Sequence, residues 1–470
     1  MIPTQSVSSV LTNLFSGDGS PVFNLQISEG SFGTAAIIAA GIFLLVFIAI
    51  SMRLLHETTA ALLGAAAVFL VTYIGGTLNP DLRILTFEEA MTFVDWNVIF
   101  LILGMMIFMA ILSETNVFKW LAFHLYRLAR GDTWLIVVLL VSLTGFTSAL
   151  LNDVTAILLI APLSIQLAVA LGFSPLAIVI AEVLASNIGG AATLIGDPPS
   201  TIVGSHIGIS FGEYLVNMAP VAILSMITLL IINRIQYRKE YRQGKKSLSP
   251  VLVEKLSEES HIEDRATLYK ALLIGSLTFI MFFIADQFGS MPPSVVAIAG
   301  AAILIAWVRP EMESMMREVD WTTLIFFIGL FIIVGGMEAT GAIDWLATRI
   351  QILAGDSLER AVLLTTWGAG FASAIVANIP FTVAALPVVD YLTLTIPGAA
   401  ESGVLYWALI LGADFGGNAT YIGSAPNIVA VGLLAHAGYR LSFSRFMRDG
   451  VPVTIATLII ATIWLFVRYL

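Results

Sequence analysis

Long apolar stretches, broken by short polar ones, run along most of this chain. A helix that crosses a bilayer needs about 20 mostly apolar residues. Stretches of this kind occur at 34–51, 59–78, 96–112, 217–233, 322–337 and 451–467. Their apolar residues are continuous and do not alternate with polar ones, as the strands of a membrane β-barrel would require. The pattern therefore predicts an all-α polytopic membrane protein.

One charged stretch divides the apolar pattern into two halves. From about Arg234 to Lys270, lysines and arginines are interleaved with glutamates and aspartates. This stretch of under 40 residues is too short for most soluble domains, so we expect an aqueous linker. The expected organisation is an N-terminal tail at 1–33, a first membrane repeat at 34–233, the linker at 234–266 and a second repeat at 267–470.

The second half repeats landmarks of the first half in the same order. Asp95-Trp96 recurs as Asp320-Trp321, at a shift of 225 residues. Further recurrences, at shifts of 225 or 227, are Pro162 and Pro387, Gly189-Gly190 and Gly416-Gly417, Thr193 and Thr420, Gly196 and Gly423, and Pro199 and Pro426. Chance similarity between apolar helices does not predict this order, so we infer an internal duplication.

Each repeat is predicted to cross the membrane five times. The crossings of the first repeat are 34–51, 59–78, 96–113, 175–205 and 217–233, and its re-entrant hairpin has arms at 133–147 and 156–172. Those of the second are 267–286, 292–308, 322–338, 404–434 and 451–467, with hairpin arms at 360–376 and 382–397. Because five is odd, the second repeat must be inverted, which is a common plan in secondary transporters.

The basic residues indicate the orientation of the chain. In this topology 18 of the 22 lysines and arginines fall on the side of the linker, and 4 fall on the other side. Cytoplasmic loops carry the excess of basic residues in membrane proteins. We therefore expect a multi-pass protein of the inner (cytoplasmic) membrane, with a cytoplasmic linker and both termini extracytoplasmic.

The amino-acid composition is that of a membrane protein, and it excludes sites that depend on cysteine. Hydrophobic residues make up 58% of the 470 residues and charged residues only 11%, too few for the surface of a soluble protein. The net charge of −10 is spread over loops, and we expect no nucleic-acid partner. The absence of cysteine excludes disulfides, thiolate metal sites and thiol nucleophiles.

Two polar segments in each repeat interrupt the apolar runs. One is SALLNDVTAILLIAP, repeated as SAIVANIPFTVAALP, and the other is SNIGGAATLIGDPPSTIVGS, repeated as ADFGGNATYIGSAPNIVAVG. Glycine and proline interrupt helices, and broken backbone at membrane depth is tolerated only where it is buried or lines a cavity. We expect backbone breaks at Gly189, Gly190, Gly196, Gly416, Gly417 and Gly423.

Acidic residues inside the membrane are costly and therefore indicate functional sites. Asp153, Glu182, Asp197 and Asp414 are such residues, although Glu182 lies mid-helix and could simply pair with a neighbour. Amide and hydroxyl side chains share the same segments. The candidate substrate- or ion-binding residues are Asn152, Asp153, Thr155, Asn187, Thr193, Asp197, Asn378, Thr382, Asp414, Asn418, Thr420, Ser424 and Asn427.

The motifs of rival protein classes are incomplete in this sequence. HETTA (His56–Ala60) lacks the second histidine of a zinc-protease helix. LIGD (Leu194–Asp197) has leucine where an aspartyl intramembrane protease needs glycine. GKKS (Gly244–Ser247) follows Lys239, which stands where a phosphate-binding loop needs its first glycine. We therefore expect a transporter that is not an enzyme and has no cofactor.

The polar segments resemble the signatures of the ion transporter superfamily, in particular the branch with ArsB-type arsenite permeases, NhaD-type sodium/proton antiporters and the melanosomal P protein. Asn187–Val203 and Gly416–Val429 are similar to the two broken-helix signatures of that branch, and LNDVTAILLIAP and ANIPFTVAALP to its hairpin tips. The resemblance covers the chain from about residue 34 to the end. It implies one hairpin and one broken helix per repeat, a scaffold that dimerises, and elevator-like movement.

The hairpin tips depart from those of the relatives, which commonly read Asp-Asn. The first tip here is Asn152-Asp153, in reversed order, and the second is Ala377-Asn378, without an acid. We therefore expect one carboxylate-bearing site, in the first repeat, where Asp153 and Asn152 could also hold sodium. Our hypothesis is that Asp153 is the coupling carboxylate, because its repeat mate Asn378 cannot titrate.

Three cargoes fit these residues. Proton-coupled efflux of arsenite or antimonite is favoured by the resemblance, and hydroxyl and amide groups could hold the uncharged hydroxide form. Sodium/proton antiport is second, because a carboxylate with free carbonyls suits a hard cation. A dicarboxylate is third, because the four segments offer no arginine to pair with it. Expected partners are a small inorganic ion or anion, a coupling proton or sodium, lipid and a second copy of the chain; a cytoplasmic ATPase is left open.

Overall fold

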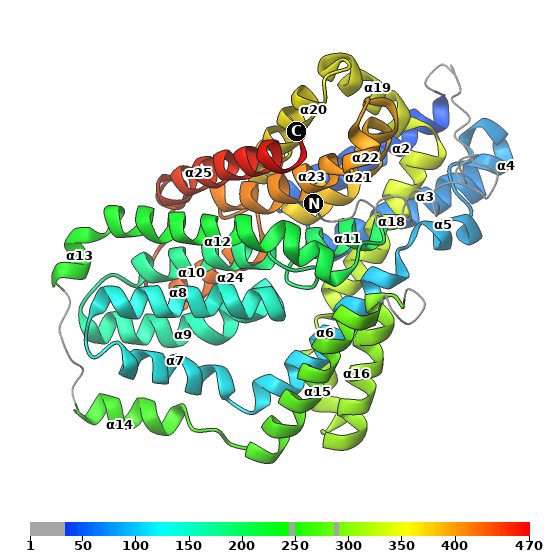
Figure 1. Ribbon diagram of the computed structural model, residues 1–470. Helices are drawn as coiled ribbons and strands as arrows, with labels where there is room; N and C mark the ends of the chain where they lie inside the picture. Colours follow the sequence, from blue (N-terminus) through cyan, green and yellow to red (C-terminus); the bar gives the residue numbers. More distant parts are fainter. Residues whose placement is uncertain (1–32, 244–249, 286–290) are drawn as a thin grey trace.

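The protein is all-helical in the computed structural model, which describes residues 33–243, 250–285 and 291–470 (Figure 1). Almost all of the expected N-terminal tail (1–33) and the GKKS segment of the linker lie outside the described residues. Within these described ranges, nine helices are long and apolar enough to cross a membrane. The expected all-α polytopic fold with two inverted repeats is confirmed.

The first repeat contains the expected crossings and hairpin. Its helices are α2 (Thr34–Ser51), α3 (Glu57–Leu70) with the π-helical turn η1 (Val71–Gly75) and α4 (Gly76–Leu78), the 3-10 turn η2 (Pro80–Leu82), α5 (Phe87–Phe93), α6 (Trp96–Glu114), α7 (Val117–Leu128), α8 (Thr133–Leu150), α9 (Asp153–Leu171), α10 (Pro175–Gly190), α11 (Pro198–His206) and α12 (Phe211–Gln236). Arms α8 and α9 form the hairpin, and α10 with α11 forms the broken crossing.

The second repeat follows the same order after two helices in the linker. These helices are α13 (Arg238–Gln243) and α14 (Pro250–Glu259), followed by α15 (Arg265–Ile284), α16 (Pro293–Val308), α17 (Met312–Glu318), α18 (Trp321–Ala339), α19 (Ala342–Ala354), α20 (Leu358–Ile375), α21 (Asn378–Thr395), α22 (Ala399–Ser402), α23 (Val404–Gly416), the 3-10 turn η4 (Gly417–Ala419), α24 (Ala425–His436) and α25 (Phe443–Tyr469). Here α20 and α21 form the hairpin, and α23 with α24 forms the broken crossing.

The short connecting helices were not expected from the apolar pattern. Helices α5 and α17, and likewise α7 and α19, occupy repeat-related positions before and after the third crossing of each repeat. They escaped prediction because a search for continuous apolar stretches does not detect helices with mixed polar and apolar residues.

The repeated Asp-Trp pair is a helix start. The carboxylate of Asp95 accepts hydrogen bonds from the backbone N–H groups at the start of α6, and Asp320 caps α18 in the same way. The indole of Trp96 donates to the carbonyl of Met91, and that of Trp321 donates to Met316. Capping by a carboxylate satisfies N–H groups that have no partner inside the helix.

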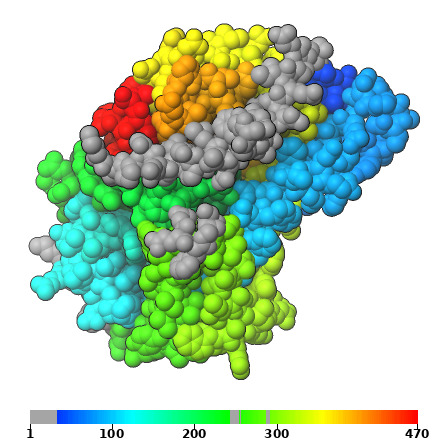
Figure 2. Space-filling view, turned by 45° about the vertical axis from the view of Figure 1, so that its right-hand side comes forward, coloured from blue at the N-terminus to red at the C-terminus, as the bar shows by residue number. Residues whose placement is uncertain are grey.

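The helices group into a scaffold and a second body that carries the hairpins. In the scaffold α6 packs on α16, α18 packs on α3, and α15 packs on α16. In the second body α8 and α9 pack on α10, while α20 and α21 pack on α23. Figure 2 shows the cyan surface of the first hairpin and the yellow and orange surface of the second on opposite sides of a green band. We call the second body the transport body.

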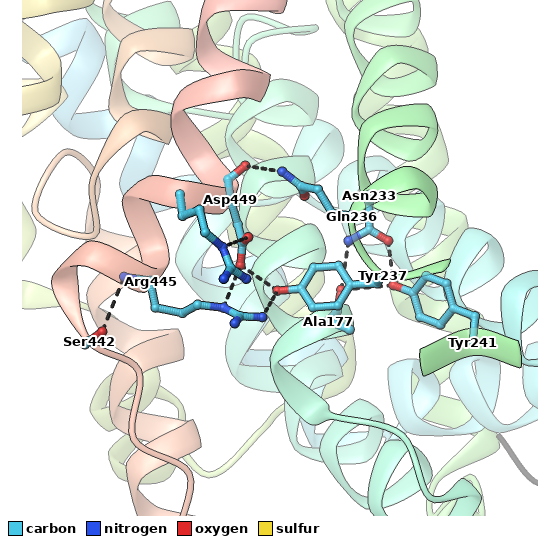
Figure 3. A network of polar contacts seen from close by, with 9 residues as sticks. Ala177, Asn233, Gln236, Tyr237, Tyr241, Ser442, Arg445 and Asp449 are labelled. Atoms are coloured by element: carbon cyan, nitrogen blue, oxygen red, sulfur yellow. Dashed lines mark hydrogen bonds and ion pairs between the residues drawn. The ribbon is translucent and has the colours of Figure 1, made fainter. Parts of the chain in front are cut away.

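A network of polar contacts joins the last helix of each repeat, α12 and α25 (Figure 3). The buried carboxylate of Asp449 accepts a hydrogen bond from the Tyr237 hydroxyl at 2.5 Å and pairs with Arg445 Nε at 3.2 Å. Burial, and then the adjacent Asp449, raise the pKa of Tyr237, so its hydroxyl stays protonated and donates. The network therefore fixes the linker end of α12 to the start of α25.

Candidate functional site

The two broken crossings unwind after their glycine pairs. Helix α10 continues through Gly190, and α11 begins at Pro198; α23 ends at Gly416, and η4 precedes the start of α24 at Ala425. Of the glycines expected to break the helices, Gly196 and Gly423 lie inside the unwound segments and Gly417 lies in η4, whereas Gly189 and Gly190 still belong to α10 and Gly416 ends α23. The breaks therefore begin slightly later than expected. The proline at each restart explains this position, because proline suits the first turn of a helix.

The glycine pairs allow close packing against the hairpins. A Cβ atom on Gly189 would overlap the backbone of Gly145 in α8, and one on Gly416 would overlap the backbone of Gly370 in α20. Gly190 and Gly417 similarly lie against the backbone of the glycine that ends each break. Glycine is needed here because the backbones touch directly.

Hydroxyl groups tie each hairpin tip to the broken helix of its own repeat. The Thr193 hydroxyl donates to the carbonyl of Ala149, and the Thr420 hydroxyl donates to that of Ala374. Ser148 and Ser373 make a second repeat-related pair of bonds, to the carbonyls of Ser186 and Ala413. The hairpins therefore end at the depth of the breaks, as re-entrant arms do. Thr193 and Thr420 therefore bind backbone carbonyls of the hairpins with their hydroxyl groups.

Two carboxylic acids from different repeats meet between the breaks. The side chains of Asp197 and Asp414 lie within hydrogen-bonding reach of each other. Asn378 Nδ2 donates to Asp197 Oδ2 at 3.4 Å, and Ser200 Oγ donates to Asp414 Oδ2 at 3.2 Å. All four side chains are at most 1% exposed, and Asp153 is close enough to both acids to interact electrostatically. We call Asp197 and Asp414 the acid pair.

A group of neutral side chains lies beside the acid pair. Asn187 Nδ2 donates to Asn418 Oδ1 at 2.8 Å and to Asn427 Oδ1 at 3.1 Å. Ser424 Oγ donates to Asn187 Oδ1 at 3.0 Å, and Asn427 Nδ2 also donates to the carbonyls of Gly417 and Thr420. These buried amides hold the two breaks together across the repeats.

The acid pair and the neutral group are the same arrangement made twice. A shift of 227 residues converts Asn187 to Asp414, Asp197 to Ser424 and Ser200 to Asn427. The contact of Asn187 with Ser424 thus corresponds to the contact of Asp414 with Asp197. Duplication produced two equivalent half-sites, and only one pair of these corresponding positions carries acids.

The hairpin tips predict one carboxylate-bearing site in the first repeat, whereas the acids that lie together here come from both repeats. The acid pair takes one carboxyl from each repeat, and Asp153 is a third acid beside them. The expectation was based on hairpin tips alone, whereas Asp414 comes from a broken helix of the second repeat. Inverted repeats that interlock place such residues together although they are far apart in sequence.

The first hairpin tip lines a small pocket. Asn152 Oδ1 caps α9 by accepting from the N–H groups of Val154 and Thr155, and Asp153 Oδ1 also accepts from Val154 N. The pocket is lined by Ile102, Met105, Met106, Leu151, Asn152, Ile195, Pro198 and Thr201. Thr155 is partly exposed, whereas Thr382 is buried and donates to the Asn378 carbonyl. The pocket lies between scaffold helix α6 and the transport body.

Two site residues, Ser200 and Tyr214, were missed by sequence reasoning. Ser200 bonds Asp414 directly, and the fully buried Tyr214 interacts with Ser200 and Asp414. Comparing Ser200 with Asn427 at the shift of 227 could have indicated Ser200. Tyr214 lies outside the four polar segments, and no sequence motif indicated it.

The site is acidic without a balancing cation. Across the described residues, no lysine, arginine or histidine is buried, whereas Asp153, Asp197 and Asp414 are at most 3% exposed. Over the same ranges, no three His, Cys, Asp or Glu side chains are arranged to hold a metal ion. Two ionised carboxylates at hydrogen-bonding distance repel strongly in a low dielectric, so the acid pair requires a proton or a cation.

Comparison with known proteins places the chain in a family. The sequence profile of the family described as "CitMHS: Citrate transporter" matches residues 42–412. The chain belongs to the citrate transporter family. It is thus a membrane transporter, and the resemblance to a transporter superfamily is confirmed at this level.

Relatives of this transporter agree with that assignment. The "46 kDa membrane protein" of Mycobacterium leprae is 36% identical over 93% of this chain and 99% of its own. The P protein of Sus scrofa is 30% identical over 94% of this chain and 60% of its own. The crystal structure of the Alcanivorax borkumensis YdaH transporter has a TM-score of 0.56, with 14% identity over 92% of this chain and 98% of that one, which shows a shared fold.

Proposed function

We propose that this transporter is a secondary active transporter that couples its cargo to protons at the acid pair. The observation that carries the proposal is the contact between two fully buried carboxyl groups, Asp197 and Asp414. Each carboxyl has one oxygen without a hydrogen-bond partner. Buried groups of this kind are costly unless a ligand satisfies them, and a shared proton does so with the least rearrangement.

The proposed cycle alternates between protonated and deprotonated forms of the site. A protonated acid pair is close to neutral and can cross the membrane interior with the transport body. Loss of the proton leaves buried negative charge, which needs a cation or a new proton before the body can return. The separation of the described helices into scaffold and transport body supports elevator-like movement.

A carboxylate is the first cargo that we propose. Membership in the citrate transporter family supports it. No cationic side chain is buried in the described residues, so an anion entering beside Asp153 would be repelled unless protons were bound first. The geometry therefore favours a carboxylate moving together with protons. A small pocket beside Asn152 lies between the scaffold and the transport body, next to Asp153.

Arsenite is the second candidate cargo. Its uncharged hydroxide form needs no counter-charge, and the amides of Asn187, Asn418 and Asn427 supply neutral donors and acceptors. Sodium is a third candidate because three buried acids attract cations. All three cargoes are compatible with proton coupling at the acid pair. One assay distinguishes between them.

The assay uses purified protein in liposomes that contain a pH-sensitive dye. Citrate, arsenite and sodium chloride are added outside in turn, and the lumenal pH is followed. We expect citrate to change the lumenal pH, and we expect Asp197→Asn and Asp414→Asn each to reduce the signal to that of empty liposomes. Glu182→Gln is the matched control, because Glu182 is fully buried and bonded to Ser164, outside the acid pair.

The outcomes separate the alternatives. A pH change with arsenite or sodium instead of citrate would identify that ion as the cargo and would leave the proposed coupling site unchanged. Unchanged signals in both acid-pair variants would overturn the coupling site. If Asp153→Asn alone abolished the signal, the coupling group would be Asp153, as the sequence hypothesis holds.

A further inference from the structure

A second group of titratable side chains lies away from the acid pair, at the far end of α11. His206 Nε2 lies 2.9 Å from Asp390 Oδ2 and 3.0 Å from Asp390 Oδ1. The hydroxyl of Tyr406 donates to Asp390 Oδ1 at 2.7 Å. His206 belongs to the first repeat, whereas Asp390 and Tyr406 belong to the second, so this ion pair also joins the repeats.

Helices α11 and α21 contact each other at two places, beside the acid pair and at His206 and Asp390. Helix α11 starts beside Asp197, and α21 starts at Asn378, which donates to Asp197. The same two helices meet again at His206 and Asp390, further along both. They are thus joined near both ends, and the predicted topology places the outer end on the extracytoplasmic side. Moving α21 away from α11 would uncover Asp197 from that side.

The surroundings of His206 are acidic and reachable by water. The side chain of His206 is 36% exposed and that of Asp390 is 29% exposed. Glu338 at the end of scaffold helix α18 and Asp95 at the start of α6 also act electrostatically on His206. Asp344 on α19 acts on Glu338. Acidic groups of three neighbouring elements, α21, α18 and the start of α6, therefore act on one histidine, and α6 and α18 belong to the scaffold.

The repeat-related positions on the opposite side cannot form this ion pair. A shift of 227 converts His206 to Leu433, and a shift of 225 relates Asp390 to Ile165. Both residues pack in or against the apolar core. Duplication therefore left a titratable contact at the extracytoplasmic end and an apolar one at the cytoplasmic end.

We propose that His206 and Asp390 form an extracytoplasmic latch that holds α21 against α11 while His206 is protonated. Histidine ordinarily titrates near pH 6.5, so the charge of His206 can change over the physiological range, whereas its geometry places it on the Asp390 carboxyl group. While the imidazole ring is protonated the contact is an ion pair; when the ring is neutral a weaker hydrogen bond remains. The latch would therefore close at low external pH and open at high external pH, controlling access to the acid pair from outside.

The latch can be tested without knowing the cargo, because the chain contains no cysteine. Val383, a buried residue of α21 between Asn378 and Asp390, is replaced by cysteine as a reporter. Its labelling by a membrane-impermeant maleimide is measured at pH values from about one unit below 6.5 to about two units above it. Each rate is divided by that of the exposed reference Asp356→Cys, which removes the intrinsic pH dependence of the thiol.

We expect normalised labelling to increase about two- to five-fold at the higher pH values, the range for a partly exposed ion pair. His206→Gln and Asp390→Asn should each label fast at all of these pH values. His436→Gln is the matched control: His436 ends the repeat-related helix α24 and is exposed. An equal pH dependence with and without His206 would overturn the latch, and so would its loss in His436→Gln. Because transport is not measured, failure of the proposed function would leave this result unaffected.

Discussion

Tyr214 shows how one hydroxyl distinguishes the two half-sites. Its side chain is fully buried, its ring meets that of Trp407 at 5.5 Å, and its hydroxyl donates to the carbonyl of Ala191 at 3.4 Å. Ser200 connects Tyr214 to Asp414. A shift of 232 relates Tyr214 to Phe446, so the neutral half-site has the ring without the hydroxyl. The hydroxyl-bearing ring, Tyr214, therefore lies in the half-site that contains the acid pair.

Tyr214→Phe should therefore weaken the acidic half-site while keeping its packing. We expect a loss of about 0.5–1.5 kcal/mol in the free energy of unfolding, the typical contribution of one buried hydrogen bond. Proton flux in the liposome assay should also decrease, because Ser200 loses a partner that orients it toward Asp414. Thermal unfolding in detergent checks the first effect, and unchanged flux would show that Tyr214 is structural only.

Helices α12 and α25 are joined to each other at both ends. At one end Asp449 accepts from Tyr237, and at the other end Asn217 Oδ1 accepts from Tyr469 at 2.8 Å and from Arg468 Nε at 2.7 Å. A shift of 232 converts Asn217 to Asp449 and Tyr237 to Tyr469. The contacts at the two ends are therefore related by the duplication. Together they fasten the last helix of the first repeat to the last helix of the second.

Asp449→Ala should be strongly destabilising, because it removes the acceptor for Tyr237 and the partner of Arg445. We expect a loss of about 2–4 kcal/mol, below the range for a fully buried ion pair because Arg445 is 32% exposed. Asp449→Asn is the matched control and should lose less, since Asn217 accepts the equivalent bonds at the other end. Equal losses in both variants, measured by thermal unfolding, would contradict this account.

At the scale of the whole molecule, inversion of the repeats determines which groups face each side of the membrane. The loop after α19 and the linker should lie on opposite sides, because 18 of the 22 basic residues accompany the linker. Single cysteines replacing the exposed residues Asp356 and Glu258 test this in whole cells. We expect an impermeant maleimide to label Asp356→Cys in intact cells and Glu258→Cys only after the membrane is opened. Labelling of both in intact cells would refute the orientation.

The sequence determined the elements of this protein, because membrane crossings, hairpins and breaks depend on local composition. Continuous apolar stretches and recurring Gly, Thr and Pro residues predicted the broken crossings and re-entrant arms, with breaks placed slightly early. Polar residues at membrane depth predicted Asp197, Asp414 and Asn187 as site residues one by one. These signals extend over a few helical turns, so a single sequence contains them.

The tertiary structure alone decided which of those residues meet. Asp197 contacts Asp414, and His206 contacts Asp390, across repeats that interlock. Residue partners so far apart in sequence are selected by helix packing, in which Gly189 approaches the backbone of Gly145 and Gly416 approaches that of Gly370. No local pattern contains that packing, because it results from the contact of two complete repeats.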